Sequence, residues 1–136
     1  MTKKLLVAVP LIAGAALLSV GVRSQDAEER PESKSPPVEV VGEPVDCINI
    51  SRIRSTQVHD DYTIDFEMPG KEVYRNTLPN RCPQLGFEER FAYEANIGQL
   101  CAVDTISVIQ GGAVGRGPRC GLGKFTPVRY VEPSGS

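Results

Sequence analysis

The clearest structural signal in the chain lies in residues 62–78, which read YTIDFEMPGKEVYRNTL. Residues 62–68 alternate between apolar and polar side chains, and this period of two is typical of a half-buried strand. Pro69 and Gly70 follow as a turn, because proline presets the bend and glycine permits a positive φ. Residues 72–78 then continue as a second strand, so the segment predicts a β-hairpin.

Further short elements are expected on both sides of this hairpin. Asp60 and Asp61 favour a tight turn, since aspartate tolerates left-handed geometry, and residues 55–60 before them extend the hairpin to an antiparallel meander. Asp46 is expected to cap a short helical turn over residues 47–51. The remaining expected elements are a short strand at 91–93 or a helical turn at 87–90, a buried strand at 100–109, and an edge strand at 124–131 that contains Pro127.

These elements predict a small domain that is mainly β. The stretch Gly111–Gly123 contains six glycines and is expected to be a loop or a bulged corner. A domain at residues 47–131 is short enough to bury only about two-thirds of its unfolded surface. We therefore predict a small antiparallel sheet or a partly open barrel with short helical turns, in which disulfides compensate for a thin core.

The N-terminal segment has the features of a secretory signal. Lys3 and Lys4 precede a stretch without charge at residues 5–22, and export signals combine such a positive end with an apolar segment. We expect residues 1–23 to be a cleaved signal peptide, so that the protein is periplasmic or secreted and keeps no stable membrane span. The alternative is a membrane anchor through residues 5–22, which are near the lower limit of length for a spanning helix.

The cysteines are expected to form two disulfides. The chain has four, Cys47, Cys82, Cys101 and Cys120, separated by 34, 18 and 18 residues. Structural zinc sites use close pairs such as C-x2-C, which are absent here, and export leads to an oxidising compartment. Of the three possible pairings we expect Cys82–Cys101 with Cys47–Cys120, because the first closes the irregular segment and the second joins the two ends of the domain.

Residues 24–46 differ in composition from the domain that follows. They carry seven acids, two bases and four prolines, and we interpret them as a disordered acidic linker. Residues 132–136 are expected to be a disordered tail. The region 47–136 holds ten acids and ten bases, and this neutral balance argues against nucleic-acid binding, which needs a basic surface.

His59 and Asp104 are weak candidates for catalysis. His59 is the only histidine and lies beside Asp60 and Asp61, so that a carboxylate could orient it as a general base. The favoured interpretation is an exposed histidine, since no nucleophile motif such as G-x-S-x-G is present. Asp104 lies in an apolar run, where a carboxylate needs a partner such as the backbone or an arginine. We predict no catalytic set, no cofactor and no metal site.

Arg116 and Arg119 are candidates for anion binding. They lie in the glycine-rich stretch, and exposed amides together with guanidinium groups can hold an anion. The stretch matches neither a P-loop nor a dinucleotide fingerprint, so a flexible hairpin loop is the favoured interpretation.

One pattern of residues extends over the whole domain. It consists of Cys47-Ile48, Ile53-Arg54, Asp60-Asp61, Thr63-Ile64, Phe66, Tyr74, Asn76, Leu78-Pro79, Cys82-Pro83, Tyr93, Leu100-Cys101, Asp104, Ile106, Cys120, Leu122-Gly123 and Phe125. This pattern resembles an uncharacterised family of small exported proteobacterial proteins with four cysteines, classed as a domain of unknown function. The resemblance covers residues 47–127 and implies export and a single cysteine-containing domain, without any activity, ligand or catalytic residue.

Three functions agree with these observations. The favoured one is a monomeric, non-enzymatic periplasmic module that binds an unknown envelope component or small ligand. The second is a small hydrolase that uses His59 with Asp60, Asp61 or Asp104. The third is an inhibitory or structural protein that acts through the Gly111–Gly123 loop.

Overall fold

The computed structural model describes residues 10, 14, 33–95, 97–111 and 116–132. The predicted signal peptide and anchor therefore lie outside the described residues, apart from Pro10 and Gly14. Most of the predicted tail lies outside them as well. Within the described ranges, no helix is long and apolar enough to cross a membrane.

The described residues form ten strands and three short helical segments. The strands are β1 (Val38–Val40), β2 (Cys47–Asn49), β3 (Ser55–Val58), β4 (Thr63–Glu67), β5 (Val73–Thr77), β6 (Phe91–Tyr93), β7 (Gln99–Cys101), β8 (Thr105–Ile109), β9 (Arg116–Gly121) and β10 (Phe125–Tyr130). The helical segments are two 3-10 turns, η1 (Ile50–Arg52) and η2 (Pro69–Lys71), and one α-helical turn, α1 (Leu85–Glu88).

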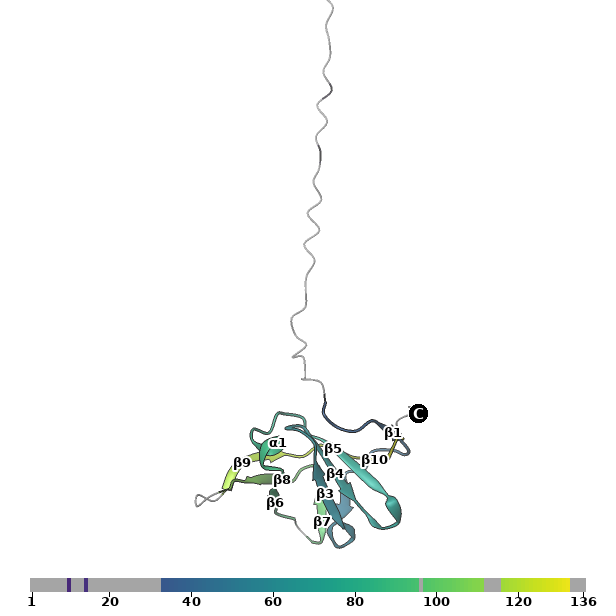
Figure 1. The fold of residues 1–136 in the computed structure, drawn as a ribbon, viewed down its shortest axis with the longest axis vertical. Coiled ribbons are helices and arrows are strands. Elements are labelled where there is room, and N and C mark those ends of the chain that lie inside the picture. Colours follow the sequence, from purple (N-terminus) through teal and green to yellow (C-terminus); the bar gives the residue numbers. More distant parts are fainter. Residues whose placement is uncertain (1–9, 11–13, 15–32, 96, 112–115, 133–136) are drawn as a thin grey trace, which may run out of the picture.

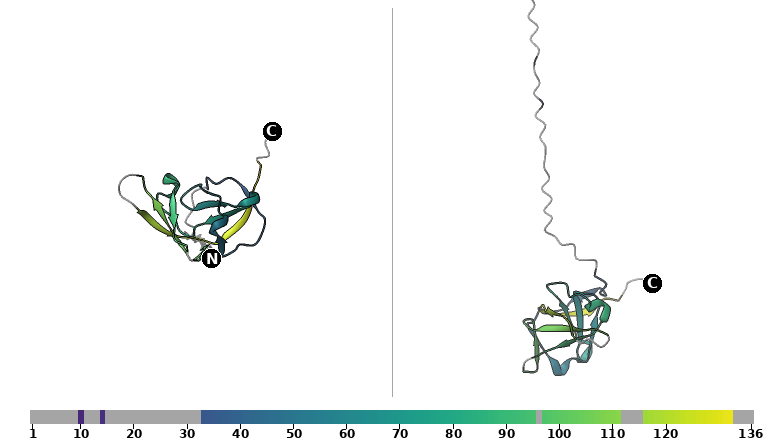
Figure 2. Two further views of the ribbon diagram at one scale, coloured as in Figure 1. Left: turned by 90° about the horizontal axis from the view of Figure 1, so that it is seen from below. Right: turned by 90° about the vertical axis from the view of Figure 1, so that its left-hand side faces the viewer.

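These strands form three antiparallel sheets. The largest has the order β1-β10-β5-β4-β3, the second has the order β6-β8-β9, and the third is the pair β2-β7. Figures 1 and 2 show the second sheet splayed away from the five-stranded sheet, with α1 at one end of the gap between their ribbons. The predicted mainly β fold with antiparallel strands, short helical turns and two disulfides is confirmed, and the sheets do not close into a barrel.

The predicted meander is confirmed as β3, β4 and β5. Phe66 in β4 lies opposite Thr56 on one side and Tyr74 on the other. Gly70 adopts a φ of 76° in the turn between β4 and β5, which is the left-handed conformation that glycine allows at low cost. The helical turn and the short strand that the sequence offered as alternatives are both present, as α1 and β6.

The prediction of a helical turn over residues 47–51 with Asp46 as its cap is wrong. Residues 47–49 form β2, and the helical turn begins at Ile50. Its cap is Asn49, whose side-chain oxygen accepts a hydrogen bond from the Ser51 N–H at 2.9 Å. Pairing with β7 holds Cys47 in an extended conformation, so tertiary contacts override the local capping preference.

The predicted continuous strand at 100–109 is also wrong, because a turn divides it. The Asp104 carboxylate accepts the Cys101 N–H at 2.7 Å, and the Asp104 N–H donates to the Cys101 carbonyl at 2.9 Å. A side chain that bonds nearby backbone competes with the sheet ladder in this way. As a result β7 pairs with β2, whereas β8 pairs with β6 and β9.

The glycine-rich stretch is only partly a loop. Residues 116–121 form β9 at the edge of the second sheet, where Pro118 needs no outward ladder partner. Residues 112–115 lie outside the described part. The loop prediction is therefore wrong for the residues that carry Arg116 and Arg119.

β10 is not the edge strand that Pro127 suggested, because β1 pairs with its outer side. The Pro127 carbonyl accepts the Val41 N–H at 2.9 Å, and the two polar groups of one residue in an antiparallel strand face the same neighbour. The side of Pro127 that lacks an N–H donor thus faces the end of β1, where the ladder of hydrogen bonds stops. The segment after β1 then pairs with β10 once more, through the bridge between Val45 and Phe125. β1 lies within the stretch interpreted as a disordered linker, so the ordered domain begins earlier than predicted.

The predicted disulfide pairing is wrong. The bonds are Cys47–Cys101 and Cys82–Cys120. Cys47 in β2 lies directly opposite Cys101 in β7, with 4.0 Å between the Cα atoms. The strand pairing that selects these partners joins segments 54 residues apart, and sequence spacing alone contains no information about it.

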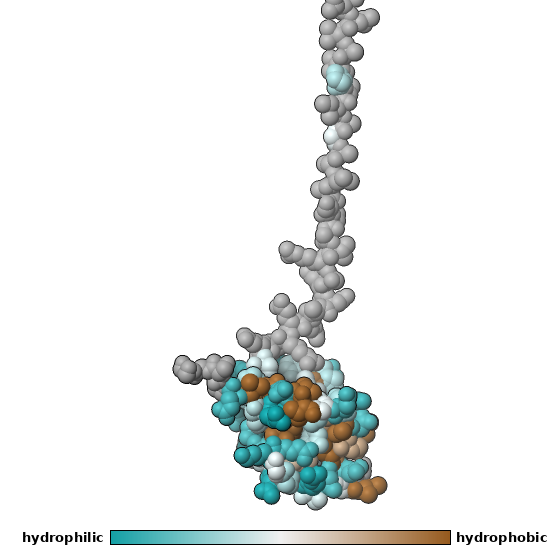
Figure 3. Space-filling model, turned by 90° about the vertical axis from the view of Figure 1, so that its right-hand side faces the viewer, coloured by the Kyte–Doolittle hydropathy of each residue, from teal (hydrophilic) through white to brown (hydrophobic). Residues whose placement is uncertain are grey.

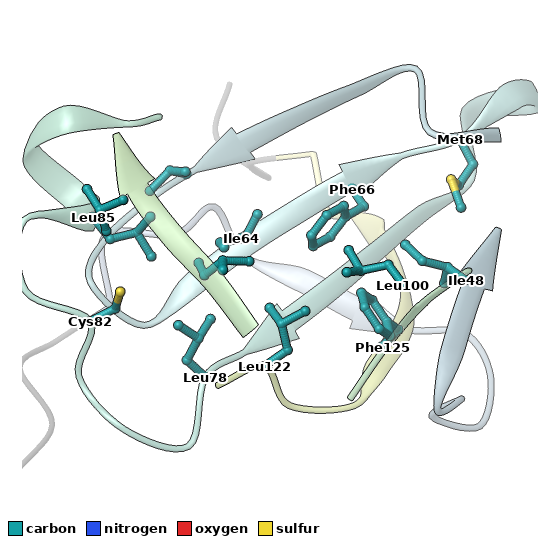
Figure 4. Close-up of a cluster of buried hydrophobic side chains, with 13 residues drawn as sticks. Ile48, Ile64, Phe66, Met68, Leu78, Cys82, Leu85, Leu100, Leu122 and Phe125 are labelled. Carbon is teal, nitrogen blue, oxygen red and sulfur yellow. The ribbon is translucent and has the colours of Figure 1, made fainter. Parts of the chain in front are cut away.

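One hydrophobic core lies between the two larger sheets and β2-β7. Phe66 and Phe125 form its centre, in an edge-to-face contact with 5.4 Å between ring centroids, a geometry that aromatic pairs prefer. Figure 4 shows side chains from β2, β4, β7, β10 and α1 converging here. The labelled members are Ile48, Ile64, Phe66, Met68, Leu78, Cys82, Leu85, Leu100, Leu122 and Phe125.

The β1 side of the molecule carries apolar residues that the core does not bury. Val40, Val41 and Val131 are exposed there. Figure 3 shows that apolar and polar patches alternate on this face. Scattered apolar exposure of this kind is ordinary for a protein surface.

Gly123 is a position at which a larger side chain is expected to destabilise the fold. A Cβ atom there would clash with the Thr77 carbonyl oxygen. The buried Asn76 amide also binds the Gly123 N–H and carbonyl, at 2.8 and 2.7 Å. We expect Gly123→Ala to lower the free energy of unfolding by about 1–3 kcal/mol, as overpacking does elsewhere.

Gly121→Ala is the matched control for this prediction, because no atom lies within 4 Å of a Cβ built at Gly121. It is expected to change stability by less than about 0.5 kcal/mol. Urea denaturation of both variants with intact disulfides measures the difference. Equal losses in the two variants would contradict the packing argument.

Candidate functional site

Asp65 is the centre of a buried polar cluster on the outer face of the five-stranded sheet. Its side chain is fully buried, although alternation along β4 predicts a solvent-facing position. Arg75 on β5 binds it with two hydrogen bonds, Nε to Oδ1 at 2.8 Å and Nη2 to Oδ2 at 3.0 Å. Tyr130 Oη donates to Oδ2 at 2.8 Å, and His59 Nε2 lies 2.7 Å from the same oxygen.

Strand register explains how these four residues meet. Asp65 in β4 lies opposite Arg75 in β5, so both side chains project from the same face of the sheet. His59 directly follows β3, and Tyr130 ends β10. Residues that lie far apart in the chain thus converge on one carboxylate.

The cluster changes the acid–base properties of its members. Burial alone would raise the pKa of Asp65, but hydrogen bonds from Arg75, Tyr130 and His59 outweigh it and hold that pKa below its usual value. Burial and the hydrogen bond to Asp65 raise the pKa of Tyr130. Asp65 is therefore an ionised acceptor and Tyr130 a neutral donor across the ordinary pH range.

Residues 33–37, here called the strap, approach the cluster from the segment before β1. The Pro36 carbonyl accepts a hydrogen bond from Arg75 Nη2 at 3.1 Å. The Ser33 and Ser35 hydroxyls reach the Asp60 carboxylate at 3.1 and 3.5 Å. The strap thus joins the sheet cluster to the turn after β3.

An open cleft of about 650 Å³ lies beside this cluster. The strap, the turn that follows β3, and the segment around α1 provide its walls. The described residues that line it are Lys34, His59, Asp60, Asp61, Tyr62, Arg81, Gly86, Phe87 and Glu89.

Hydrogen bonds fix the two aspartates of the cleft. Asp60 accepts the Tyr62 N–H at 2.8 Å in addition to the strap hydroxyls. Burial opposes this ionised state, yet the hydrogen bonds keep the pKa of Asp60 below its usual value. Asp61 accepts from Arg81 Nε at 2.9 Å and from the Gly86 N–H at 2.8 Å.

Gly86 allows α1 to approach this turn closely. A Cβ atom at Gly86 would lie 3.1 Å from the Asp60 backbone and 3.1 Å from Asp61 Oδ1. The close approach places the next residue, Phe87, on the cleft with 84% of its surface exposed. The cleft therefore has a rigid polar wall and an exposed aromatic ring.

The structure separates the residues predicted as site candidates. The prediction of an exposed His59 is wrong, because its side chain is only 11% exposed and its carboxylate partner is Asp65. It lines the cleft together with Asp60 and Asp61. Asp104 accepts the Cys101 N–H in the turn before β8, and no hydrogen bond or ion pair between described residues joins it to His59. It therefore has the backbone-bonded arrangement that was the alternative to catalysis.

Arg116 and Arg119 lie side by side with an acid rather than in an open anion site. Their guanidinium groups are 3.2 and 3.8 Å from the Glu94 carboxylate. All three side chains are largely exposed, so the pairs contribute little to stability. Anion binding by these arginines stays a prediction.

Sequence reasoning missed Asp65, Arg75, Tyr130 and the cleft residues around α1. Asp65 occupies the middle of the strongest strand pattern, but this position alone does not mark it as a site residue. An acid in a strand is expected on the solvent face, and only the strap and neighbouring strands reveal that this face is covered. Among the described residues, no group of three or more His, Cys, Asp or Glu side chains is placed to hold a metal ion.

Comparisons with protein-family models, with curated proteins and with solved structures find no match. The resemblance to a family of exported proteobacterial proteins therefore stays a prediction.

Proposed function

We propose that this protein is a non-enzymatic module of the periplasm that binds a small polar ligand in the cleft between the strap and α1. The observation that carries this proposal is the cleft of about 650 Å³, which lies within the usual size of small-molecule sites. The hydrogen bonds of Asp60 and Asp61 hold its wall in place before a ligand arrives. Such preorganisation lowers the entropic cost of binding.

Two disulfides support the proposed compartment. Disulfides form and persist in oxidising environments, which include the bacterial periplasm and the extracellular space. The Lys3-Lys4 start and the uncharged stretch after it favour export by a bacterial cell. A periplasmic ligand from the envelope is the simplest source of a partner for such a cleft.

The arrangement of His59 also favours one alternative, a small hydrolase. His59 lies in the cleft and its Nε2 is 2.7 Å from Asp65, so that the carboxylate could orient the ring for general base catalysis. However, the Asp65 charge is already compensated by the bidentate Arg75. Because Asp65 is shared with Arg75, it stabilises a positive charge on the His59 ring less than a carboxylate bonded to His59 alone would. Binding is therefore the stronger proposal.

No contact of the described residues favours the third function, inhibition through the glycine-rich loop. Residues 116–121 belong to a sheet strand that carries Cys120. Residues 112–115 lie outside the described part. Removing the whole stretch would break a disulfide, so its truncation no longer separates binding from folding.

The binding proposal is tested by nuclear magnetic resonance titration of the oxidised, isotope-labelled protein. The probes are amino acids, neutral and charged sugars, nucleosides, short peptides and polyamines. We expect at least one class to give saturable amide shifts confined to residues 59–62 and 85–89. The double variant Lys34→Ala/Glu89→Ala should weaken that binding, because both side chains are exposed at the cleft.

Lys124→Ala is the control, since Lys124 is exposed outside the cleft residues and pairs with Asp46 at 3.5 Å. It should bind like the parent protein. Absence of saturable shifts for every probe class, or shifts confined to other elements, would count against the binding function. Turnover of ester, phosphate or glycoside substrates that is lost in His59→Gln would favour the hydrolase instead.

A further inference from the structure

The chemical class of the ligand follows from the groups of the cleft that remain available. Both oxygens of Asp60 and both oxygens of Asp61 already accept hydrogen bonds within the protein. Arg81 uses Nε for Asp61 and has a largely exposed side chain, at 62%. Among the described residues, no side-chain hydrogen bond or ion pair engages its terminal guanidinium nitrogens, the Lys34 ammonium or the Glu89 carboxylate, so these charged groups of the cleft can reach a ligand.

These groups supply donors and an acceptor, but no dominant charge. The cleft holds the cations Lys34 and Arg81 together with the acids Asp60, Asp61 and Glu89. A small anion would lie close to carboxylates, and a small cation would lie close to a guanidinium and an ammonium group. A neutral ligand with many hydroxyl groups avoids both costs, because each hydroxyl can donate to Glu89 or accept from Arg81 and Lys34.

Phe87 adds a requirement for a flat apolar surface on the same ligand. Its ring is 84% exposed at the cleft, next to Gly86, whose packing against Asp60 holds α1 in place. The negative face of an aromatic ring attracts groups with partial positive charge. One face of a pyranose ring presents such C–H groups, while its edge presents hydroxyls.

We propose that the cleft binds a neutral sugar ring that stacks on Phe87, with its hydroxyls bonded to Arg81, Lys34 and Glu89. This inference rests on the proposed binding function and names its ligand class. A glycan of the cell envelope is one source of such a ring and a free sugar is another. The shared chemistry is a neutral pyranose.

The test is a titration of the oxidised protein with defined sugars, followed by amide shifts. The neutral probes are glucose, N-acetylglucosamine, maltose and chitobiose, and the charged counterparts are glucuronate and glucosamine. We expect neutral sugars to give saturable shifts at residues 59–62 and 85–89, and charged counterparts to bind more weakly. Tighter binding of the disaccharides would point to a glycan chain, and equal binding would point to a free sugar.

Phe87→Ala should weaken sugar binding about tenfold, the upper range for one aromatic contact, and Phe87→Trp should restore it. Val103→Ala is the control, because Val103 is 90% exposed and does not line the cleft.

Binding of a charged probe in the cleft without any response to neutral sugars would overturn the sugar assignment and leave the binding function intact. Absence of cleft shifts with every sugar would overturn the sugar assignment, and only absence with every probe class of the wider titration would also overturn the binding function. Sugar binding that is unchanged in Phe87→Ala would overturn the stacking.

Discussion

Reduction of both disulfides is expected to unfold the domain. Cys47–Cys101 and Cys82–Cys120 join residues 54 and 38 positions apart. In the loop-entropy model each bond of this length contributes about 4 kcal/mol by constraining the unfolded chain. Together they contribute about 8 kcal/mol, which is comparable to the roughly 5–15 kcal/mol net stability of a typical domain.

The two disulfides are expected to stabilise different parts of the fold. Cys47–Cys101 fastens β2 to β7, a two-stranded sheet of three residues per strand, and such pairs are marginal alone. Cys82–Cys120 fastens the segment before α1 to β9, so its loss should also loosen the cleft. The double variants Cys47→Ala/Cys101→Ala and Cys82→Ala/Cys120→Ala separate these effects.

Circular dichroism during urea denaturation, with and without reductant, measures the loss. Peptide mapping without reduction checks the connectivity, since one fragment pair should join residue 47 to residue 101. A reduced protein that keeps its native spectrum and its midpoint of denaturation would contradict the central role of the disulfides. A map that joins residue 82 to residue 101 would contradict the fold itself.

Asp65→Ala is the single substitution outside the cysteines for which we expect the largest loss of stability. It removes the acceptor of two hydrogen bonds from Arg75, whose side chain is only 14% exposed. Breaking a buried ion pair by removing one partner costs about 3–5 kcal/mol, because the remaining charge is left without compensation. Tyr130 and His59 lose their acceptor in the same step.

The double variant Asp65→Leu/Arg75→Met separates two costs: the loss of the ion pair itself, and the cost of leaving the Arg75 charge buried without a partner. Replacing both partners by apolar residues is expected to recover part of the stability that Asp65→Ala loses. Asp46→Asn is the control, because the Asp46 side chain is exposed and its ion pair with Lys124 is exposed too, so the change should alter stability by less than about 1 kcal/mol. A loss in Asp65→Ala no greater than that of Asp46→Asn would contradict the assigned role of the cluster.

The same cluster sets a pH window for stability. The pKa of Asp65 is lower in the folded protein than in the unfolded chain, so its contribution is complete above the unfolded value of about 3.9 and is lost as the pH falls through the folded pKa. The pKa of Tyr130 is raised by burial and by Asp65, so its contribution is complete below about 10 and is lost as the pH rises. Denaturation midpoints in the parent protein should therefore decline at both extremes, and Tyr130→Phe should remove the alkaline decline.

The hairpin and its extension could be predicted because local signals agree there. Residues 62–68 alternate in polarity, and Pro69 and Gly70 favour a turn, so β4, β5 and the left-handed Gly70 follow from neighbouring residues alone. The site could not be predicted in the same way. Asp65 shares its alternation with Thr63 and Glu67, and nothing local distinguishes the carboxylate that becomes buried.

The linker and the last strand show how a correct local argument led to a wrong conclusion. Prolines and acids favour disorder over residues 24–46, yet β1 pairs with β10 and the strap binds Asp60 and Arg75. Pro127 lacks a donor, yet it occupies a paired strand because its missing N–H faces the place where β1 ends. The paired residues of β1 and β10 lie about 90 positions apart in the chain, as Val38 and Tyr130 do, and the strap binds residues 27 and 39 positions away.

The order of residues by itself determined that the domain is built from antiparallel strands and cross-linked by cysteines. Alternation and turn chemistry depend only on neighbouring residues, and the number of cysteines can be counted without knowing the fold. Only the tertiary structure decided which cysteines join and which carboxylate is buried, and it alone brought Phe87 to the edge of a polar cleft. Those outcomes depend on strand register and on contacts between distant segments, which no local pattern encodes.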